Sequence, residues 1–196
     1  MTEDFIVEPR STKKIEEITL AWRDTLGVAN TWAPNMIDLI ENKLPNFFKK
    51  FALIVRNDPD LGDAEAFTEF SPPQIVVRKS VYLNARKQDG RSRMTLAHEL
   101  GHLVMHAGVQ SNARMITGNK QAPTHKLYRS AEWQARKFGS LFLMPTHIVR
   151  EFSSPQELVQ ACHVSLQAAQ IRFDEVGSTN RSGLPDCVRD TIAALE

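Results

Sequence analysis

The spacing of apolar residues predicts two helices near the start of the chain. Segment 11–26 carries its apolar residues at intervals of three and four, as expected of a helix with one buried face, and Gly27 follows as a stop. Pro34 favours the start of a second helix. The apolar positions of these two helices are Ile15, Ile18, Trp22 and Leu26, then Met36, Ile37, Ile40 and Leu44. Residues 1–10 have no such period and predict a flexible leader.

Short apolar runs between turn-forming residues predict a small sheet in the next part of the chain. Four candidate strands follow one another, and residues such as Asn, Asp, Pro and Gly separate them. The predicted strands are 52–55, 66–70, 74–77 and 80–83.

The remaining pattern is helical. Two predicted helices, 95–106 and 131–143, are apolar on most sides and therefore expected to be buried. Segments 155–161 and 165–173 predict two short helices joined by a tight turn, with His163 where a turn glycine is usual. Segment 109–126 is polar and predicts a surface loop, and the tail from 177 is rich in Gly, Ser, Thr and Asn.

Composition narrows the class of protein. The chain has 196 residues, 42% hydrophobic, with 24 basic and 23 acidic residues and a formal net charge of +1. This suits a globular protein without the strong positive field of a dedicated nucleic-acid binder. No apolar stretch approaches the roughly 18 residues of a membrane helix. An acidic N-terminus and only two cysteines predict a cytoplasmic location with reduced thiols.

The strongest chemical signal is an HExxH motif formed by His98, Glu99 and His102. Residues four apart on a helix lie on the same face, about 6 Å apart along the axis. Two imidazoles at this spacing can bind one metal ion, and the adjacent Glu99 can act as general base toward a metal-activated water. The alternative is a buried helix whose polar residues match the motif by chance.

A catalytic metal of this type needs a third protein ligand. His106 would lie about 12 Å along the helix axis from His98, too far to share an ion with it, so packing or support of the site is expected instead. Glu132, in an otherwise apolar helix start, is the candidate. A solvent-facing glutamate favoured by the helix dipole is the alternative, and the spacing alone leaves both open.

Two blocks of sequence resemble the signature of ImmA/IrrE-type metallo-endopeptidases: segment 91–106 around the HExxH motif, and segment 132–145. The resemblance implies an α+β fold with a minimal zincin-like core, in which helices pack on a small mixed sheet, and a C-terminal helix-turn-helix-like part. It implies His98, His102 and Glu132 as metal ligands and Glu99 as catalytic base. Many relatives carry a second Glu where this chain has Gln134. The expected organisation is a leader (1–10), a peptidase core (11–145), a helical extension (146–176) and a tail (177–196).

The resemblance implies an endopeptidase whose protein substrate is an intracellular regulator, typically a helix-turn-helix repressor or an antitoxin. Zinc is the expected cofactor, and Mn²⁺ or Fe²⁺ can occupy similar sites. Candidate oxyanion donors are Tyr128, His125 and His106. Arg91 and Arg93 are expected to contact either substrate or a carboxylate that supports the site. The alternative function is a non-catalytic, metal-containing module that sequesters a partner. Direct nucleic-acid binding is not expected, because segment 165–173 carries a single basic residue, Arg172.

Overall fold

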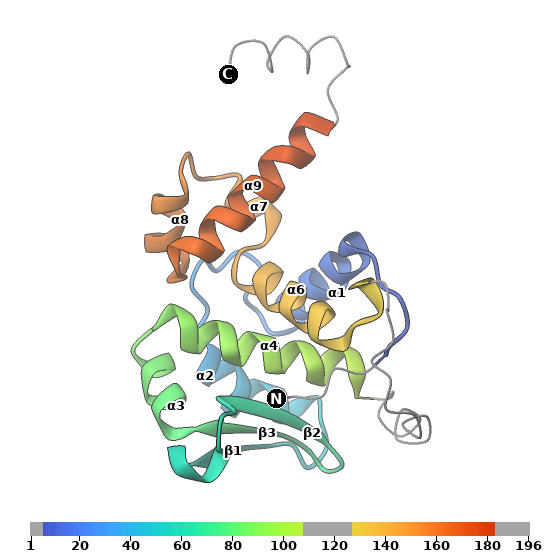
Figure 1. The fold of residues 1–196 in the computed structure, drawn as a ribbon, viewed down its shortest axis with the longest axis vertical. Coiled ribbons are helices and arrows are strands. Elements are labelled where there is room, and N and C mark those ends of the chain that lie inside the picture. The colour runs from blue at the N-terminus through green and yellow to red at the C-terminus, as the bar shows by residue number, and fades with distance from the viewer. Residues whose placement is uncertain (1–5, 108–126, 183–196) are drawn as a thin grey trace.

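A small sheet and one central helix organise the fold (Figure 1). The computed structural model describes residues 6–107 and 127–182. Its combination of helices with a mixed three-stranded sheet confirms the predicted α+β class. The helices are α1 (Thr12–Thr25), α2 (Met36–Asp38), α3 (Lys79–Arg86), α4 (Gly90–His106), α6 (Ala131–Leu143), α7 (Thr146–Val149), α8 (Pro155–Cys162) and α9 (Leu166–Ser182), and the strands are β1 (Ala52–Arg56), β2 (Ala66–Phe70) and β3 (Pro73–Arg78).

The sheet has the order β1–β3–β2. β1 runs parallel to β3, with Ile54 opposite Val76, and β2 runs antiparallel to it, with Ala66 opposite Val77. The residues at the centre of β3 are buried, as expected of a middle strand. β2 therefore forms one edge of the sheet, and this edge lies beside α4 (Figure 1).

Helix α4 lies between the sheet and α6, which explains why it is apolar on more than one face (Figure 1). Leu96, Leu100 and Leu103 are fully buried. The helix begins earlier than predicted because Asp89 caps it, accepting a hydrogen bond of 2.8 Å from the backbone N–H of Ser92.

Two glycines allow α4 and α6 to approach each other closely. A Cβ atom on Gly101 would lie 3.1 Å from the carbonyl oxygen of Ala135, and one on Gly139 would lie 3.1 Å from the backbone nitrogen of His98. The bounds of α6 agree with the prediction, and Ser130 caps its start by accepting a 2.9 Å hydrogen bond from the N–H of Trp133. The close packing brings the first turn of α6 next to the HExxH turn of α4.

The strand predicted at 80–83 is wrong, because this segment lies in helix α3. Val81 and Ala85 are buried and four residues apart, whereas Leu83 is exposed.

The second predicted helix forms differently from expectation. It begins at Met36, after the capping residue Asn35, and continues as a π turn (Leu39–Lys43) and a 3₁₀ turn (Leu44–Asn46) that contains Pro45.

The segment predicted as a flexible leader is packed against the core over residues 6–10, which we call the N-terminal strap. Ile6 pairs with Ser130 in an isolated bridge, and Val7 is buried. The backbone N–H of Val7 donates to the carbonyl of Arg129 over 2.9 Å. The strap therefore holds the residues that lead into α6, contrary to the expectation of a loose segment.

The C-terminal helices follow the predicted order, and His163 between α8 and α9 adopts the left-handed conformation expected of the turn position (φ 50°). The loop predicted from Gly177 is wrong as far as Ser182, because α9 continues to that residue. Gly177 lies inside α9, and a glycine destabilises a helix by about 1 kcal/mol without ending it. The preceding residue, Val176, is buried and packs this part of α9 against the core. The predicted loop 109–126 and the tail beyond 182 lie outside the described residues, and the division into core and extension stays a prediction.

Candidate metal centre

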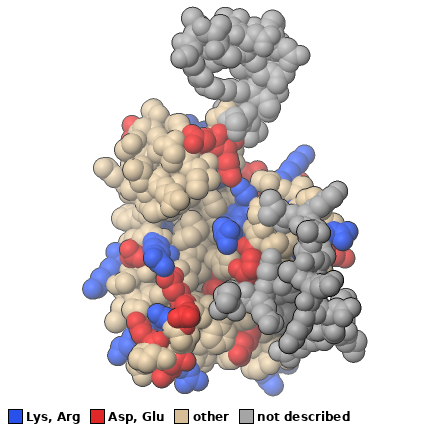
Figure 2. Space-filling view, viewed as in Figure 1, with Lys and Arg blue, Asp and Glu red and all other residues tan. Residues whose placement is uncertain are grey.

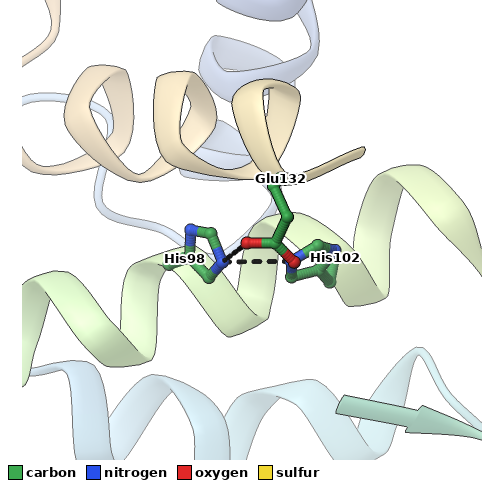
Figure 3. Close-up of side chains that lie close together, drawn as sticks. All are labelled: His98, His102 and Glu132. Carbon is green, nitrogen blue, oxygen red and sulfur yellow. Dashed lines mark hydrogen bonds and ion pairs between the residues drawn. The ribbon is translucent and has the colours of Figure 1, made fainter. Parts of the chain in front are cut away.

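His98, His102 and Glu132 come together between α4 and α6 (Figure 3). The two histidines lie one turn apart on α4, and Glu132 reaches them from the first turn of α6. The Nε2 atoms of the histidines are 3.0 Å apart, and the Glu132 carboxylate oxygens lie 3.2 Å from Nε2 of His98 and 3.1 Å from Nε2 of His102. The sequence anticipated this grouping, and it is the one such cluster within residues 6–107 and 127–182.

This donor set could hold a metal ion. Two imidazole nitrogens and one carboxylate oxygen are the ligands found in hydrolytic zinc sites, and all three ligand atoms lie within 4.8 Å of one another. His102 is 7% exposed, whereas the side chains of His98 and Glu132 are 20% and 19% exposed. The partial exposure leaves one side of the cluster accessible from solvent.

The electrostatics of Glu132 suit a metal ligand. Burial acts to raise the pKa of this carboxyl group, but hydrogen bonds from His102 and His98 and their charges outweigh burial and hold the pKa well below its usual range. Glu132 is therefore an ionised carboxylate among imidazoles, which is the form that binds a cation. The alternative interpretation, a glutamate that faces solvent at the start of a helix, is wrong for Glu132, whose side chain is 19% exposed and faces two histidines.

Glu99 lies next to His98 on α4 and is almost completely buried. Its carboxylate oxygen Oε2 accepts a hydrogen bond of 2.7 Å from the hydroxyl of Thr68 on strand β2. Sequence reasoning missed Thr68. Nothing in its local pattern distinguishes it from other strand residues, and only the folded sheet brings it to α4.

A cavity of about 770 Å³ opens beside this cluster, with His98, Glu99 and Glu132 in its wall. Other parts of the wall come from the segment leading into β2 and from the start of α9. Arg91 also lines the cavity and is paired with Glu65 over 2.5 Å. The site therefore opens into a hollow large enough for several residues of a peptide.

Not every predicted site residue reaches this cavity. Arg93 is fully buried and donates hydrogen bonds to backbone carbonyls, so the expected contact with substrate is wrong for this residue. Tyr128 is partly exposed but is not among the residues that line the cavity. His106 is fully buried behind His102, and burial lowers its pKa to about 4. His125 lies outside the described residues.

Comparisons with known proteins give the family of this chain and a related fold. A family model described as the IrrE N-terminal-like domain, of a peptidase family, matches residues 52–174. A transcriptional regulator from Mycobacterium tuberculosis has a similar fold, with a TM-score of 0.53 at 16% sequence identity over 80% of this chain. The match covers 45% of that regulator, and at this identity it shows the fold alone. A comparison with curated proteins returned no match. Because the family model covers more than half of the chain, including the HExxH helix and α6, the protein belongs to the peptidase family of the IrrE N-terminal-like domain.

Proposed function

We propose that the protein is a metal-dependent endopeptidase, with His98, His102 and Glu132 as ligands and Glu99 as general base. The observation that carries the proposal is the convergence of His98, Glu99 and Glu132 on the wall of one cavity, with His102 directly beside them. Membership of a peptidase family supports the reaction class.

Zinc is the metal that this nitrogen and oxygen donor set favours, and Mn²⁺ or Fe²⁺ are the alternatives. A bound metal of this kind lowers the pKa of a water molecule and stabilises negative charge on a carbonyl oxygen. The chain itself supplies the orientation of the ligands, through the four-residue spacing on α4 and the close approach of α6.

Glu99 moves the proton in this mechanism. Its carboxylate takes a proton from the attacking water and returns it to the amine that leaves when the peptide bond breaks. The Thr68 hydroxyl holds one carboxylate oxygen, so the base has a fixed orientation before substrate arrives. Near-complete burial of Glu99 keeps bulk water away from that proton.

We infer that the substrate is a regulatory protein in the cytoplasm, such as a helix-turn-helix repressor or an antitoxin, whose cleavage starts a stress response. The family resemblance supports this inference.

Acidic and basic side chains are interspersed on the face of the molecule in Figure 2. In the described residues, no helix is long and apolar enough to cross a bilayer. Arg172 is buried and bonded to the Met144 carbonyl over 3.0 Å, so it is not available for contact with DNA phosphates.

A cleavage assay tests the proposal. The zinc- or manganese-loaded protein is mixed with the repressor-like protein encoded beside its gene, in parallel with the Glu99→Gln variant. The expected result is cleavage by the wild type alone, with metal still bound to the variant. Glu17→Gln, at an exposed position on α1, serves as the matched control and is expected to cleave normally.

Two results would contradict this mechanism or this function. Cleavage by the Glu99→Gln variant at the wild-type rate would exclude Glu99 as the base. Binding of the partner without cleavage by either protein would favour the alternative function, in which a metal-containing module regulates its partner by sequestration.

A further inference from the structure

A chain of buried polar side chains lies behind the metal site, on the side of His102 away from Glu132. Nδ1 of His102 is 3.2 Å from Nδ1 of His106, and Nε2 of His106 is 3.2 Å from Oε1 of Gln134. His106 and Gln134 are completely buried. The chain connects α4 to α6 and continues into the N-terminal strap, where Arg10 donates to Oε1 of Gln134 over 2.8 Å.

The orientation of the Gln134 amide is determined by its other contacts. Its nitrogen Nε2 lies 2.8 Å from the carbonyl oxygen of Glu8 and 2.8 Å from that of Tyr128. Backbone carbonyls only accept hydrogen bonds, so the atom facing them must be the amide nitrogen, which has two N–H groups to donate. The amide oxygen of Gln134 therefore faces Arg10 and His106, and it can only accept.

The direction of every following hydrogen bond is then fixed. Because Oε1 of Gln134 accepts, Nε2 of His106 carries the proton and donates it. A neutral imidazole protonated at Nε2 presents a lone pair at Nδ1, so Nδ1 of His106 accepts from Nδ1–H of His102. With a metal ion bound, the lone pair of His102 is thereby on Nε2, the atom that faces His98 and that, without an ion, donates to Glu132.

We propose that Gln134 and His106 are positioning residues that set the tautomer and the ring orientation of the metal ligand His102. The hydrogen bond to the second ring nitrogen of a metal-binding histidine usually ends on a carboxylate, a backbone carbonyl or water, and it strengthens metal binding. Here a second imidazole takes that place, and the N-terminal strap completes its support through Arg10 and the Glu8 carbonyl. The inference depends on the metal site of the proposed function but not on peptidase activity.

The position of the imidazole protons tests the proposal directly. In the zinc-loaded full-length protein, two-bond proton–nitrogen correlation spectra of ¹⁵N-labelled histidines report which ring nitrogen is protonated. The expected result is N–H at Nε2 of His106 and at Nδ1 of His102. A proton on Nδ1 of His106, or zinc on Nδ1 of His102, would overturn the proposal.

A pair of variants at His106 tests the energetic consequence. The amide oxygen of Asn can still accept from Nδ1–H of His102, whereas Leu has a similar volume without an acceptor. We expect zinc affinity, measured by competition with a chelator, to fall about 10- to 100-fold in His106→Leu and to remain near the wild-type value in His106→Asn.

Circular dichroism establishes that each variant is folded before its affinity is compared. Unchanged zinc affinity in folded His106→Leu, or equal losses of zinc affinity in both variants, would overturn the proposal. If His106→Leu does not fold, the proton positions in the wild type decide the question alone. If the imidazole protons are found as expected but the protein cleaves no substrate, the positioning role of Gln134 and His106 stands and the proposed peptidase function is wrong.

Discussion

The hydroxyl of Thr68 donates a hydrogen bond of 2.7 Å to Oε2 of Glu99, and so connects the edge strand of the sheet to the candidate base on α4. The same hydroxyl oxygen lies 3.0 Å from the backbone carbonyl of Glu99. The sheet therefore does more than cover the apolar face of α4. Its edge strand orients the carboxylate that the proposed mechanism requires.

Replacement of Thr68 by Val keeps the shape of the side chain and removes this hydrogen bond. A hydrogen bond to a charged group contributes about 1.5–3 kcal/mol, and 1.36 kcal/mol corresponds to about a tenfold change in rate. We expect kcat for peptide cleavage to fall about tenfold or more in Thr68→Val, with little change in KM, because Thr68 orients the base rather than the substrate. Steady-state kinetics at saturating metal measure both constants.

The matched control is Thr68→Ser, which retains the hydroxyl and is expected to keep most of the activity. Equal kcat in the wild type and Thr68→Val would show that the position of Glu99 does not depend on this hydrogen bond. A fall of kcat in both Thr68→Val and Thr68→Ser would show that the packing of the Thr68 side chain, and not its hydroxyl, supports the activity.

Removal of the Glu132 carboxylate is expected to release the metal. In Glu132→Ala the two histidines lose the carboxylate that lies 3.1–3.2 Å from them, the proposed third ligand. Loss of a ligand should weaken zinc binding by more than the roughly 10- to 100-fold that loss of an outer hydrogen-bond partner costs. Metal content after dialysis and chelator competition measure the effect. Glu17→Ala, at an exposed site on α1, is the control, and equal metal retention in both variants would exclude Glu132 as a ligand.

The parts of the site that the sequence predicted depend on local geometry. The four-residue spacing of His98 and His102 places both side chains on one face of any helix. Helix 131–143 has the predicted bounds, because Ser130 caps its start and Pro145 follows its end. Membership of the peptidase family agrees with the motif blocks that suggested it.

The parts that were missed depend on contacts between distant residues. Thr68 and Glu99 are 31 positions apart, and the Glu8 carbonyl that orients Gln134 is 126 positions away from it. The error at 80–83 has a different cause. A short apolar run cannot distinguish a strand from a helix by period alone, and here Val81 and Ala85 share one helical face.

Arg93 is expected to matter for stability rather than for substrate binding. It is fully buried, and its guanidinium donates to the carbonyls of Cys162, His163 and Pro34, which ties the helix that carries the HExxH motif to two other parts of the chain. Burial lowers its pKa to about 10, so it stays charged at neutral pH. Arg93→Leu leaves these carbonyls without a partner, at about 1–3 kcal/mol each. We expect urea unfolding to show a loss of stability of at least about 3 kcal/mol, the lower end of that sum.

Arg91 is the matched control for Arg93. Its side chain is 81% exposed and pairs with Glu65 at the surface, and such pairs contribute about 0–1 kcal/mol. Arg91→Leu should therefore unfold at nearly the wild-type urea concentration. A similar small effect for Arg93→Leu would show that its buried hydrogen bonds are replaced at little cost.

The close approach of α4 and α6 at Gly101 should couple protein stability to metal binding. A Cβ there would lie 3.1 Å from both the Ala135 carbonyl oxygen and Cβ of Phe138, so Gly101→Val must push the helices apart. Overpacking of this kind costs about 1–3 kcal/mol. The proposed ligands come from both helices, so zinc affinity should fall together with thermal stability. Gly177→Val is the control, because nothing lies within 4 Å of its Cβ position on α9. Normal zinc affinity in a destabilised Gly101→Val variant would show that the spacing of the helices does not control the metal site.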